Sequence, residues 1–228
     1  DLEEAGYSLD ELDGIDQAAK RAAALARQLL LFSRREDMKP AVFSLSGLAR
    51  EDERMLRRII GEGATLVIRA LADDDLVRAD RARVEQAVVN LIANARDVTG
   101  RGGRIFLATG TVRYEEPVMG AFEPVPAGDW SYIEVVDEGP GIPPEIQEKV
   151  FQPFFTTKPA DRGTGLGLST VAGIVRQAEG RVELVSEPGA GTTMRLLFPR
   201  VTDSRSGDGS ADRDRAAARA RHVAPPAG

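Results

Sequence analysis

The chain has 228 residues, which is enough for one substantial domain with a helical appendage or for two small domains. Its hydrophobic fraction of 42% is ordinary, and no run approaches the roughly 18 apolar residues of a membrane span. A net charge of -6 argues against a nucleic-acid surface, and the lack of cysteine excludes disulfides and thiolate metal sites. Because no signal peptide opens the chain, we expect a cytoplasmic protein without membrane contact in this segment.

The first predicted element is a long helix over residues 8–36. Ser8 and Glu11 have the spacing of a capping box. A core helix of the next domain is one interpretation, but the polar residues 34–37 and Pro40 separate this helix from the rest of the chain. We therefore assign residues 1–40 to a unit that dimerises or lacks a partner helix. Its apolar residues recur at steps of three and four, as in a coiled coil or helical hairpin: Leu9, Leu12, Ile15, Ala19, Ala22, Leu25, Leu29 and Phe32.

Helices and strands are mixed over residues 41–200, without the regular alternation of a doubly wound sheet. This pattern predicts an α+β fold, a two-layer sandwich with helices on one face of a mostly antiparallel sheet. On the first of its helices we expect Leu48, Met55 and Ile59 to share one face. Residues 201–228 have no apolar period and are expected to be a disordered tail or linker. The expected helices are residues 46–60, 80–98 and 166–178, and the expected strands are 65–70, 104–113, 130–136, 181–186 and 192–198.

The helix that begins at Asp80 combines an apolar face with a polar stripe. Asparagine is a poor helix former, so Asn90 and Asn94 on one stripe require an explanation. Simple surface exposure is one; the other is that an amide oxygen faces Mg²⁺, a hard cation that takes oxygen ligands. The expected apolar face is Val84, Ala87, Val88, Leu91, Ala95 and Val98, and the expected stripe is Arg83, Gln86, Asn90, Asn94 and Asp97.

A second candidate site comes directly after the strand over residues 130–136. Asp137 stands at the end of this strand, and Gly139 and Gly141 come after it. Such a sequence is typical of a turn. In a binding site the carboxylate would accept a hydrogen bond from the exocyclic amine of adenine, and the glycines would let the backbone approach the ring.

A third candidate site is a glycine-rich run that opens the last predicted helix. It is not a Walker A loop, since it lacks the Gly-Lys-Ser/Thr ending, and no strand immediately precedes it as in a Rossmann fingerprint. Backbone N–H groups at a helix N-terminus nevertheless favour phosphate. The run consists of Gly163, Thr164, Gly165, Leu166, Gly167 and Leu168.

Residues 151–162 connect the second and third sites and are expected to form a lid over a bound nucleotide. Lys158 in this segment would bring a positive charge to the same phosphates. Three phenylalanines begin the segment, and we expect two of them to belong to the core: Phe151, Phe154 and Phe155.

Taken together, these blocks resemble the ATP-binding catalytic domain of sensor histidine kinases, the Bergerat-type fold shared with DNA gyrase, the Hsp90 chaperones and mismatch-repair ATPases. The resemblance covers roughly residues 43–199, and the motif sequences are most similar to those of nitrogen-sensor and hybrid kinases. The matching motifs occur in the family's order: residues 90–94 as the N box, 137–141 as G1, 151–155 as the F box, 163–168 as G2, and 191–193 as the last turn.

The resemblance implies ATP and Mg²⁺ as ligands, with Asn94 as the metal ligand and with Asp137 and Thr193 near adenine. Hydrolytic members carry a glutamate base where this chain has Asn90, which cannot take a proton, so phosphoryl transfer is favoured over hydrolysis. The implied ATP-binding residues are Asn90, Asn94, Asp97, Asp137, Gly139, Gly141, Lys158, Gly163, Thr164, Gly165, Leu166, Gly167, Leu168 and Thr193.

The chain departs from the family at the phosphoacceptor. Residues 8–37 are similar to the second helix of a dimerisation hairpin, but the partner helix with its histidine is missing from this sequence. The only histidine, His222, lies in the predicted tail and lacks an acidic neighbour. The expected partners are thus a second copy of the chain through the N-terminal helix, a histidine-bearing helix and a response-regulator receiver domain. A non-catalytic nucleotide-binding scaffold and an anti-sigma-type serine kinase are the alternatives.

Overall fold

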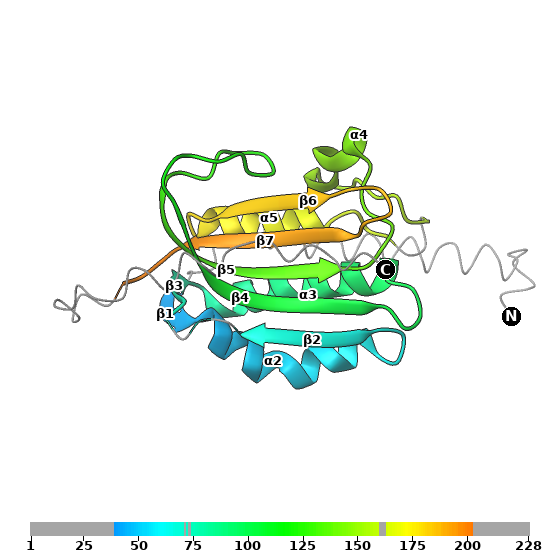
Figure 1. Ribbon diagram of the computed structural model, residues 1–228, viewed down its shortest axis with the longest axis horizontal. Coiled ribbons are helices and arrows are strands. Elements are labelled where there is room, and N and C mark those ends of the chain that lie inside the picture. Colours follow the sequence, from blue (N-terminus) through cyan, green and yellow to red (C-terminus); the bar gives the residue numbers. More distant parts are fainter. Residues whose placement is uncertain (1–38, 71, 73, 160–162, 203–228) are drawn as a thin grey trace, which may run out of the picture.

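A five-stranded sheet organises the described part of the chain (Figure 1). The computed structural model describes residues 39–70, 72, 74–159 and 163–202. The predicted N-terminal helix, its dimerisation and most of the predicted tail therefore lie outside the described residues. The element bounds are β1 Ala41–Ser44, α2 Leu45–Ile60, β2 Thr65–Ala70, β3 Leu76–Ala79, α3 Arg81–Val98, β4 Arg104–Tyr114, β5 Gly128–Asp137, α4 Pro144–Gln147, η1 Lys149–Phe151, α5 Gly167–Gln177, β6 Arg181–Ser186 and β7 Thr192–Pro199.

The strand order of the sheet is β2-β4-β5-β7-β6. β2 runs parallel to β4, and all other neighbours are antiparallel. In the β5–β7 pairing Asp137 lies opposite Thr192, which places both residues at the same end of the sheet. The α+β class and the mostly antiparallel sheet predicted from the sequence are confirmed.

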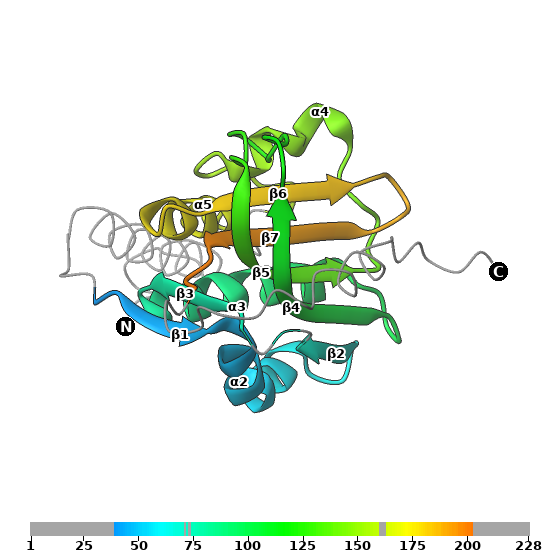
Figure 2. The ribbon, with the colours of Figure 1, turned by 60° about the vertical axis from the view of Figure 1, so that its left-hand side comes forward.

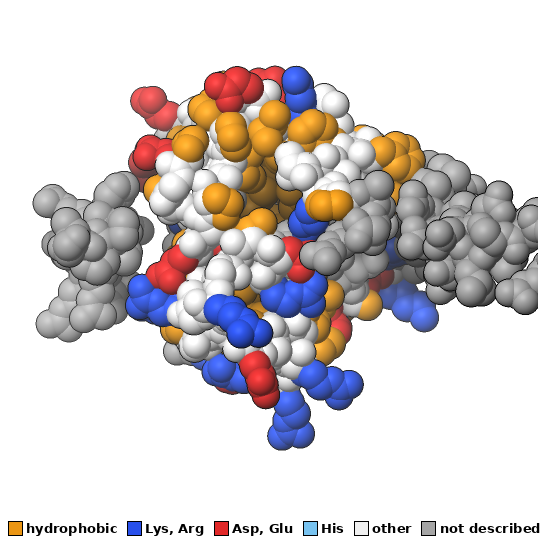
Figure 3. Space-filling model, turned by 90° about the vertical axis from the view of Figure 1, so that its right-hand side faces the viewer, with side chains coloured by type: hydrophobic (Ala, Val, Ile, Leu, Met, Phe, Trp, Pro, Cys, Tyr) orange, Lys and Arg blue, Asp and Glu red, His pale blue; other side chains and the backbone are white. Residues whose placement is uncertain are grey.

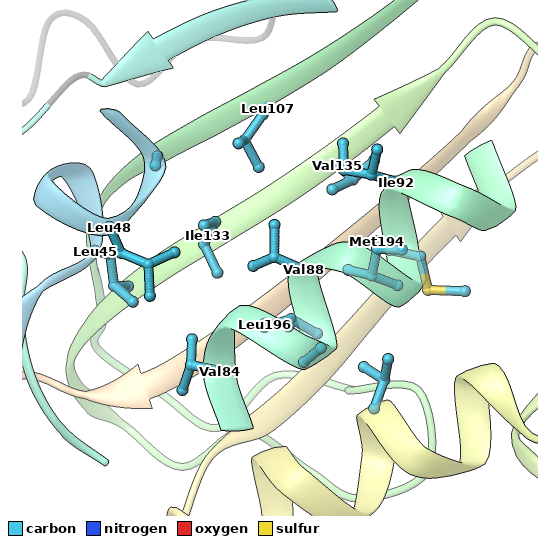
Figure 4. Close-up of a cluster of buried hydrophobic side chains, with 14 of the residues drawn as sticks. Leu45, Leu48, Val84, Val88, Ile92, Leu107, Ile133, Val135, Met194 and Leu196 are labelled. Carbon is cyan, nitrogen blue, oxygen red and sulfur yellow. The ribbon is translucent and has the colours of Figure 1, made fainter. Parts of the chain in front are cut away.

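Helices α2, α3 and α5 cover one face of the sheet and bury a continuous apolar core (Figures 1 and 4). Alternate residues of β4, β5 and β7 point into this core, as the two-residue period of a strand requires. α3 lies between the other two helices and packs against both. Figure 4 shows core side chains from α2, α3 and the sheet, among them Leu45, Leu48, Val84, Val88, Ile92, Leu107, Ile133, Val135, Met194 and Leu196.

The predicted face of α2 was partly wrong. Leu48 is buried, but Met55 is 37% exposed, and the neighbouring Leu56 takes the inward position. The predicted start at Ser46 is also displaced, because Ser44 is the N-cap and accepts a hydrogen bond from Gly47 N at 3.0 Å. Ser46 is instead buried, and its N–H donates to the carboxylate of Asp75 at 2.8 Å.

A two-stranded sheet that was not predicted, β1 with β3, lies at one end of the molecule (Figure 2). Its strands have four residues each, which is too short for a clear periodic signal. The C-terminal end of the domain joins them, since Val201 N donates to Leu76 O at 2.9 Å and Arg200 forms a bridge with Val77. The two ends of the described chain therefore meet at this sheet.

Asp80 caps α3 as predicted, and its removal is expected to destabilise the domain. Its Oδ1 accepts hydrogen bonds from Ala82 N at 3.1 Å and Arg83 N at 3.3 Å. Asp80→Ala should lower the free energy of unfolding by about 1 kcal/mol, because two N–H groups of the first turn lose their acceptor. Urea denaturation would measure the loss. Asp80→Asn keeps an oxygen acceptor and should retain most of the stability; an equal loss in both variants would contradict the capping role.

Candidate functional site

A cleft of about 540 Å³ opens at the end of the sheet where β5 finishes. The second half of α3, the turn after β5, residues 155–158 and the glycine-rich run form its walls, and β5 and β7 contribute to its floor. Figure 3 views the molecule from this end and shows a hollow lined by hydrophobic side chains. The fold thus brings together at one opening the three candidate sites that the sequence separates.

Most of the residues expected to contact ATP lie on this cleft. They come from α3, from the turn after β5 and from the segment that leads into α5. Those that line it are Asn94, Asp97, Asp137, Gly141, Lys158, Gly163, Thr164, Gly165, Gly167 and Leu168, and those that do not are Asn90, Gly139, Leu166 and Thr193.

Strand parity explains the position of Thr193. Neighbouring residues of a strand point to opposite faces of the sheet, so only one of Thr192 and Thr193 faces the helices. The structure places Thr192 on the cleft, 8% exposed, and Thr193 on the other face. The threonine nearest Asp137 is therefore Thr192.

The other three expected residues that do not line the cleft support the elements that form its walls. Asn90 donates from Nδ2 to Gly167 O at 3.4 Å and so links α3 to the start of α5. Leu166 is only 8% exposed and packs inward. A Cβ on Gly139 would lie 2.7 Å from Asp137 Oδ1 and 2.8 Å from Val98 Cγ2, so this turn has no room for a larger residue.

Asp137 is the buried carboxylate of the cleft. It is 8% exposed, and its Oδ1 accepts a hydrogen bond from Gly139 N at 2.9 Å. Burial raises its pKa, although hydrogen bonds from the backbone N–H groups of Gly139 and Thr192 act in the opposite direction. Those bonds fix the carboxylate, which can accept a further hydrogen bond from a ligand within the cleft.

Close backbone contacts hold the turn after β5 against the β6–β7 turn. Gly141 has φ +72°, and a Cβ there would lie 2.0 Å from Glu187 O. Gly191 has φ +85°, and a Cβ there would lie 2.1 Å from Asp137 O. Gly189 N also donates to Pro140 O at 2.7 Å. Glycine is required at positions 141 and 191 because no other residue combines this conformation with this approach.

A cation lies between the polar residues of α3 on the opposite wall. Lys158 Nζ donates to Asp97 Oδ2 at 2.7 Å and to Asn94 Oδ1 at 3.3 Å. Partial burial would raise the pKa of Asp97, but hydrogen bonds from Lys158 and Arg96 outweigh this and hold it below the usual range. The spacing of Asn94 and Asp97 along the helix thus directs both side chains to one point.

The glycine-rich run is tied to the segment that carries Lys158. Phe154 N donates to Gly165 O at 2.9 Å, and a Cβ on Gly165 would lie 2.3 Å from the carbonyl carbon of Phe154. A Cβ on Gly163 would lie 2.4 Å from Thr156 Oγ1. α5 begins within this run, at Gly167, and no side chain caps its first turn in the described structure. Its first N–H groups are thereby left to face an anion.

An apolar wall completes the cleft, and most of its residues were not predicted from the sequence to lie there. Val98, expected in the core, is 41% exposed because it ends α3 beside the turn that contains Gly139. Leu91, Phe155 and Leu168 lie within the N, F and G2 boxes, and Leu168 was expected to contact ATP. The other apolar residues lie outside the motifs and are indistinguishable in sequence from core residues: Ala95, Val135, Ile142, Ile146, Val150 and Met194.

The three phenylalanines after α4 divide among different environments. Phe151 packs against the core, whereas Phe155 is half-buried and lines the cleft. Phe154 is 59% exposed and has φ +69°. The expectation that two of the three belong to the core therefore holds for Phe151 alone.

Comparisons with known proteins agree with this geometry. Residues 79–202 match the family model described as histidine kinase-, DNA gyrase B-, and HSP90-like ATPase. The chain is 40% identical to the sensor kinase CckA of Brucella abortus over 201 residues. This match covers 88% of this chain and 21% of that protein. It is 32% identical to the sensor protein FixL of Bradyrhizobium diazoefficiens over 204 residues, and this match covers 85% of this chain and 36% of that protein. The chain thus spans about a fifth to a third of the length of these relatives.

Solved structures show the same fold. The catalytic domain of histidine kinase ThkA superposes with a TM-score of 0.55 at 30% identity, covering 72% of this chain and 97% of that chain. A complex of ThkA with the response regulator protein TrrA matches with a TM-score of 0.58 at 24% identity, covering 85% of this chain and 51% of that chain.

No helix among the described residues is long and apolar enough to cross a membrane. The resemblance inferred from the sequence motifs is confirmed: the chain belongs to the histidine kinase-, DNA gyrase B-, and HSP90-like ATPase family.

Proposed function

We propose that this chain binds Mg·ATP in the cleft and forms the catalytic part of a two-component sensor histidine kinase. The observation that carries the proposal is the pairing, within one cleft, of a buried carboxylate at one end with an amide oxygen, an ammonium group and a helix N-terminus at the other. The first end suits a base with an exocyclic amine, and the second suits phosphates. Family membership supports the same reaction class.

Asp137 would select adenine. Its free hydrogen-bonding capacity accepts from the exocyclic amine, whereas guanine presents a carbonyl oxygen at that position and would be repelled. The apolar wall, with Ile142 and Met194, would pack against the faces of the ring. Thr192, whose N–H already holds the carboxylate, lies next to the same edge.

Asn94 would hold Mg²⁺ together with the phosphates. The fit is supported by the Lys158 ammonium, a cation that already contacts Asn94 Oδ1. A neutral amide oxygen suits this hard cation without repelling the triphosphate. Bound Mg²⁺ would supply neutralisation of the phosphate charge. Lys158 and the N–H groups at the start of α5 would orient the γ-phosphoryl group, so that catalysis is chiefly positioning.

Asn90 argues for transfer to a side chain rather than hydrolysis. Its amide cannot accept a proton from water, and its Nδ2 is engaged with Gly167 O. We therefore expect slow release of inorganic phosphate. The acceptor would be a histidine on a dimerisation helix, from which the phosphoryl group passes to a response-regulator receiver; ThkA, a relative in fold, has been solved with a response regulator.

The proposed organisation extends beyond the described residues. Residues 1–40 would be the second helix of the dimerisation hairpin and would form a homodimer, residues 41–200 the ATP-binding domain, and residues 201–228 a linker. The cytoplasm is the compartment that ATP and a receiver domain require.

A transfer assay tests the proposal. The chain is incubated with Mg²⁺, γ-labelled ATP and a separately supplied two-helix hairpin that bears the acceptor histidine of a related kinase. The expected product is acid-labile, base-stable label on the hairpin, with little free phosphate. Nucleotide binding without label on the hairpin would favour the scaffold, and acid-stable label would favour a serine kinase. A hairpin with histidine replaced by glutamine is the matched control.

A further inference from the structure

The contact between Lys158 and α3 joins residues that lie 61 and 64 positions apart in the sequence. The ammonium group lies between two oxygens, Asp97 Oδ2 at 2.7 Å and Asn94 Oδ1 at 3.3 Å. The side chains of Lys158 and Asp97 are 27% and 31% exposed, so the pair lies in the wall of the cleft rather than on the open surface. Two oxygens around one cation have the form of a small cation site.

Arg96 fixes the carboxylate of this site. Its Nε and Nη2 donate to Asp97 Oδ1 at 3.0 and 2.6 Å, and its Nη1 donates to Ile59 O at 3.0 Å. Oδ1 is thus held by a guanidinium anchored on α2, and Oδ2 is directed to Lys158. A carboxylate that is already oriented loses little conformational freedom when its cation changes.

The backbone that carries Lys158 is also fixed. Lys158 N donates to Thr156 Oγ1 at 3.1 Å, and Gly163 N donates to Pro159 O at 3.2 Å. A Cβ on Gly163 would lie 2.9 Å from Lys158 Cβ, which places the base of the lysine against the glycine-rich run. The base of the Lys158 side chain is thus held against Gly163, in the segment that leads into α5.

The oxygen of Asn94 that contacts the ammonium is the same oxygen proposed for Mg²⁺. A metal ion on that oxygen and an ammonium group 3.3 Å from it would repel each other strongly. We propose that Asn94 Oδ1 and Asp97 Oδ2 form one cation subsite, which Lys158 fills in the free protein and which Mg²⁺ takes over when it binds with nucleotide. This inference rests on the proposed function of the cleft.

Each residue then has a distinct part. Asn94 supplies a ligand oxygen, and Asp97 is a positioning residue that accepts hydrogen bonds from the water molecules that Mg²⁺ retains. The displaced Lys158 ammonium becomes free to pair with phosphate at the start of α5. The subsite therefore keeps its positive charge whether or not nucleotide is present.

Metal binding to the nucleotide-free chain tests the shared subsite, because no phosphate is then present for Lys158 to contact. Mn²⁺ is the probe, since it also prefers oxygen ligands, and electron paramagnetic resonance would count the free ion. Lys158→Met should tighten Mn²⁺ binding by about 5- to 10-fold over the parent chain, because the competing ammonium is gone. The double variant Lys158→Met with Asp97→Asn should lose this gain. Lys149→Met, an exposed lysine on η1, should behave as the parent.

Unchanged or weaker Mn²⁺ binding by Lys158→Met, in a variant with parental circular dichroism and melting temperature, would overturn the inference. Titration of ADP with Mg²⁺ into the parent chain separates this failure from that of the proposed function. If the parent binds Mg·ADP but Lys158→Met binds Mn²⁺ no more tightly than the parent, only the shared subsite is refuted. If the folded parent does not bind Mg·ADP, the nucleotide site is refuted. Tighter Mn²⁺ binding by Lys158→Met would in that case still support the cation subsite.

Discussion

Asp137→Asn is expected to weaken the binding of ADP by about 10- to 100-fold, the effect of one hydrogen bond to a buried charged acceptor. Asparagine is nearly isosteric, and its oxygen can still accept from the N–H groups of Gly139 and Thr192 that hold Asp137 now. Its NH₂ group would then face the exocyclic amine of adenine, donor against donor. The variant should therefore stay folded while losing the base.

Calorimetric titration of ADP in the presence of Mg²⁺ would measure this effect. The matched control is Glu138→Gln, which changes the adjacent carboxylate. Glu138 accepts hydrogen bonds from Arg104 and does not line the cleft, so its variant should bind ADP as the parent does. Equal binding by the parent and Asp137→Asn would refute the adenine role of Asp137.

The burial of Asp137 predicts how ADP affinity depends on pH. Burial raises the pKa of Asp137, so the acceptor form is lost at a higher pH than for an exposed aspartate. ADP affinity should be constant above this raised pKa and should fall as the pH drops through it. Asp137→Asn has no group to protonate at this position and should show a flatter profile. A parent profile as flat as that of the variant would contradict the assignment.

Gly141→Ala is expected to lower the free energy of unfolding by about 2 to 3 kcal/mol. Gly141 has φ +72°, and the new Cβ would lie 2.0 Å from the backbone oxygen of Glu187, which cannot rotate away. Either the turn after β5 or the β6–β7 turn must move. Because Gly141 also lines the cleft, ADP binding should weaken with stability.

Gly189 provides a control that separates strain from collision. It has φ +82°, similar to Gly141, but a Cβ there would meet nothing within 4 Å. Gly189→Ala should therefore show only the conformational cost, about 1 kcal/mol. Urea denaturation of both variants would give the comparison. If the two substitutions lower the free energy of unfolding equally, the close approach between the turns does not contribute to stability.

Long periodic elements were predictable from the sequence, and short ones were not. Asp80 and the apolar period after it define α3, and the β-branched run at residues 65–70 defines β2. β1 and β3, with four residues each, exist because they pair with each other, and such a distant pairing leaves no local pattern. Met55 was predicted to face the core because apolar residues occur on more than one side of α2. Packing against β2 and α3 determines which side is buried.

The polar part of the cleft was more predictable than its apolar part. Helical spacing alone brings Asn94 and Asp97 to one side of α3, and the structure places both on the cleft. Thr193 was chosen over Thr192 because a motif does not reveal strand parity, which the pairing with Asp137 determines. Met194 and Ile142 were missed because an apolar side chain has the same sequence signature in a binding cleft and in a core.

The junction of β1, β3 and Val201 has a mechanical consequence. Lys39 N donates to Asp80 and Val201 N donates to Leu76, so both ends of the described chain lie at one pole of the domain, beside the β1–β3 sheet. The cleft lies where β5 finishes. Figure 1 shows the end of β5 at the opposite pole from β1 and β3. A rigid body tethered at a single pole swings about that point, and a small rotation there becomes a large arc at the far end. Under the proposed function, a rotation at this pole would move a nucleotide held in the cleft toward or away from an acceptor without deforming the cleft.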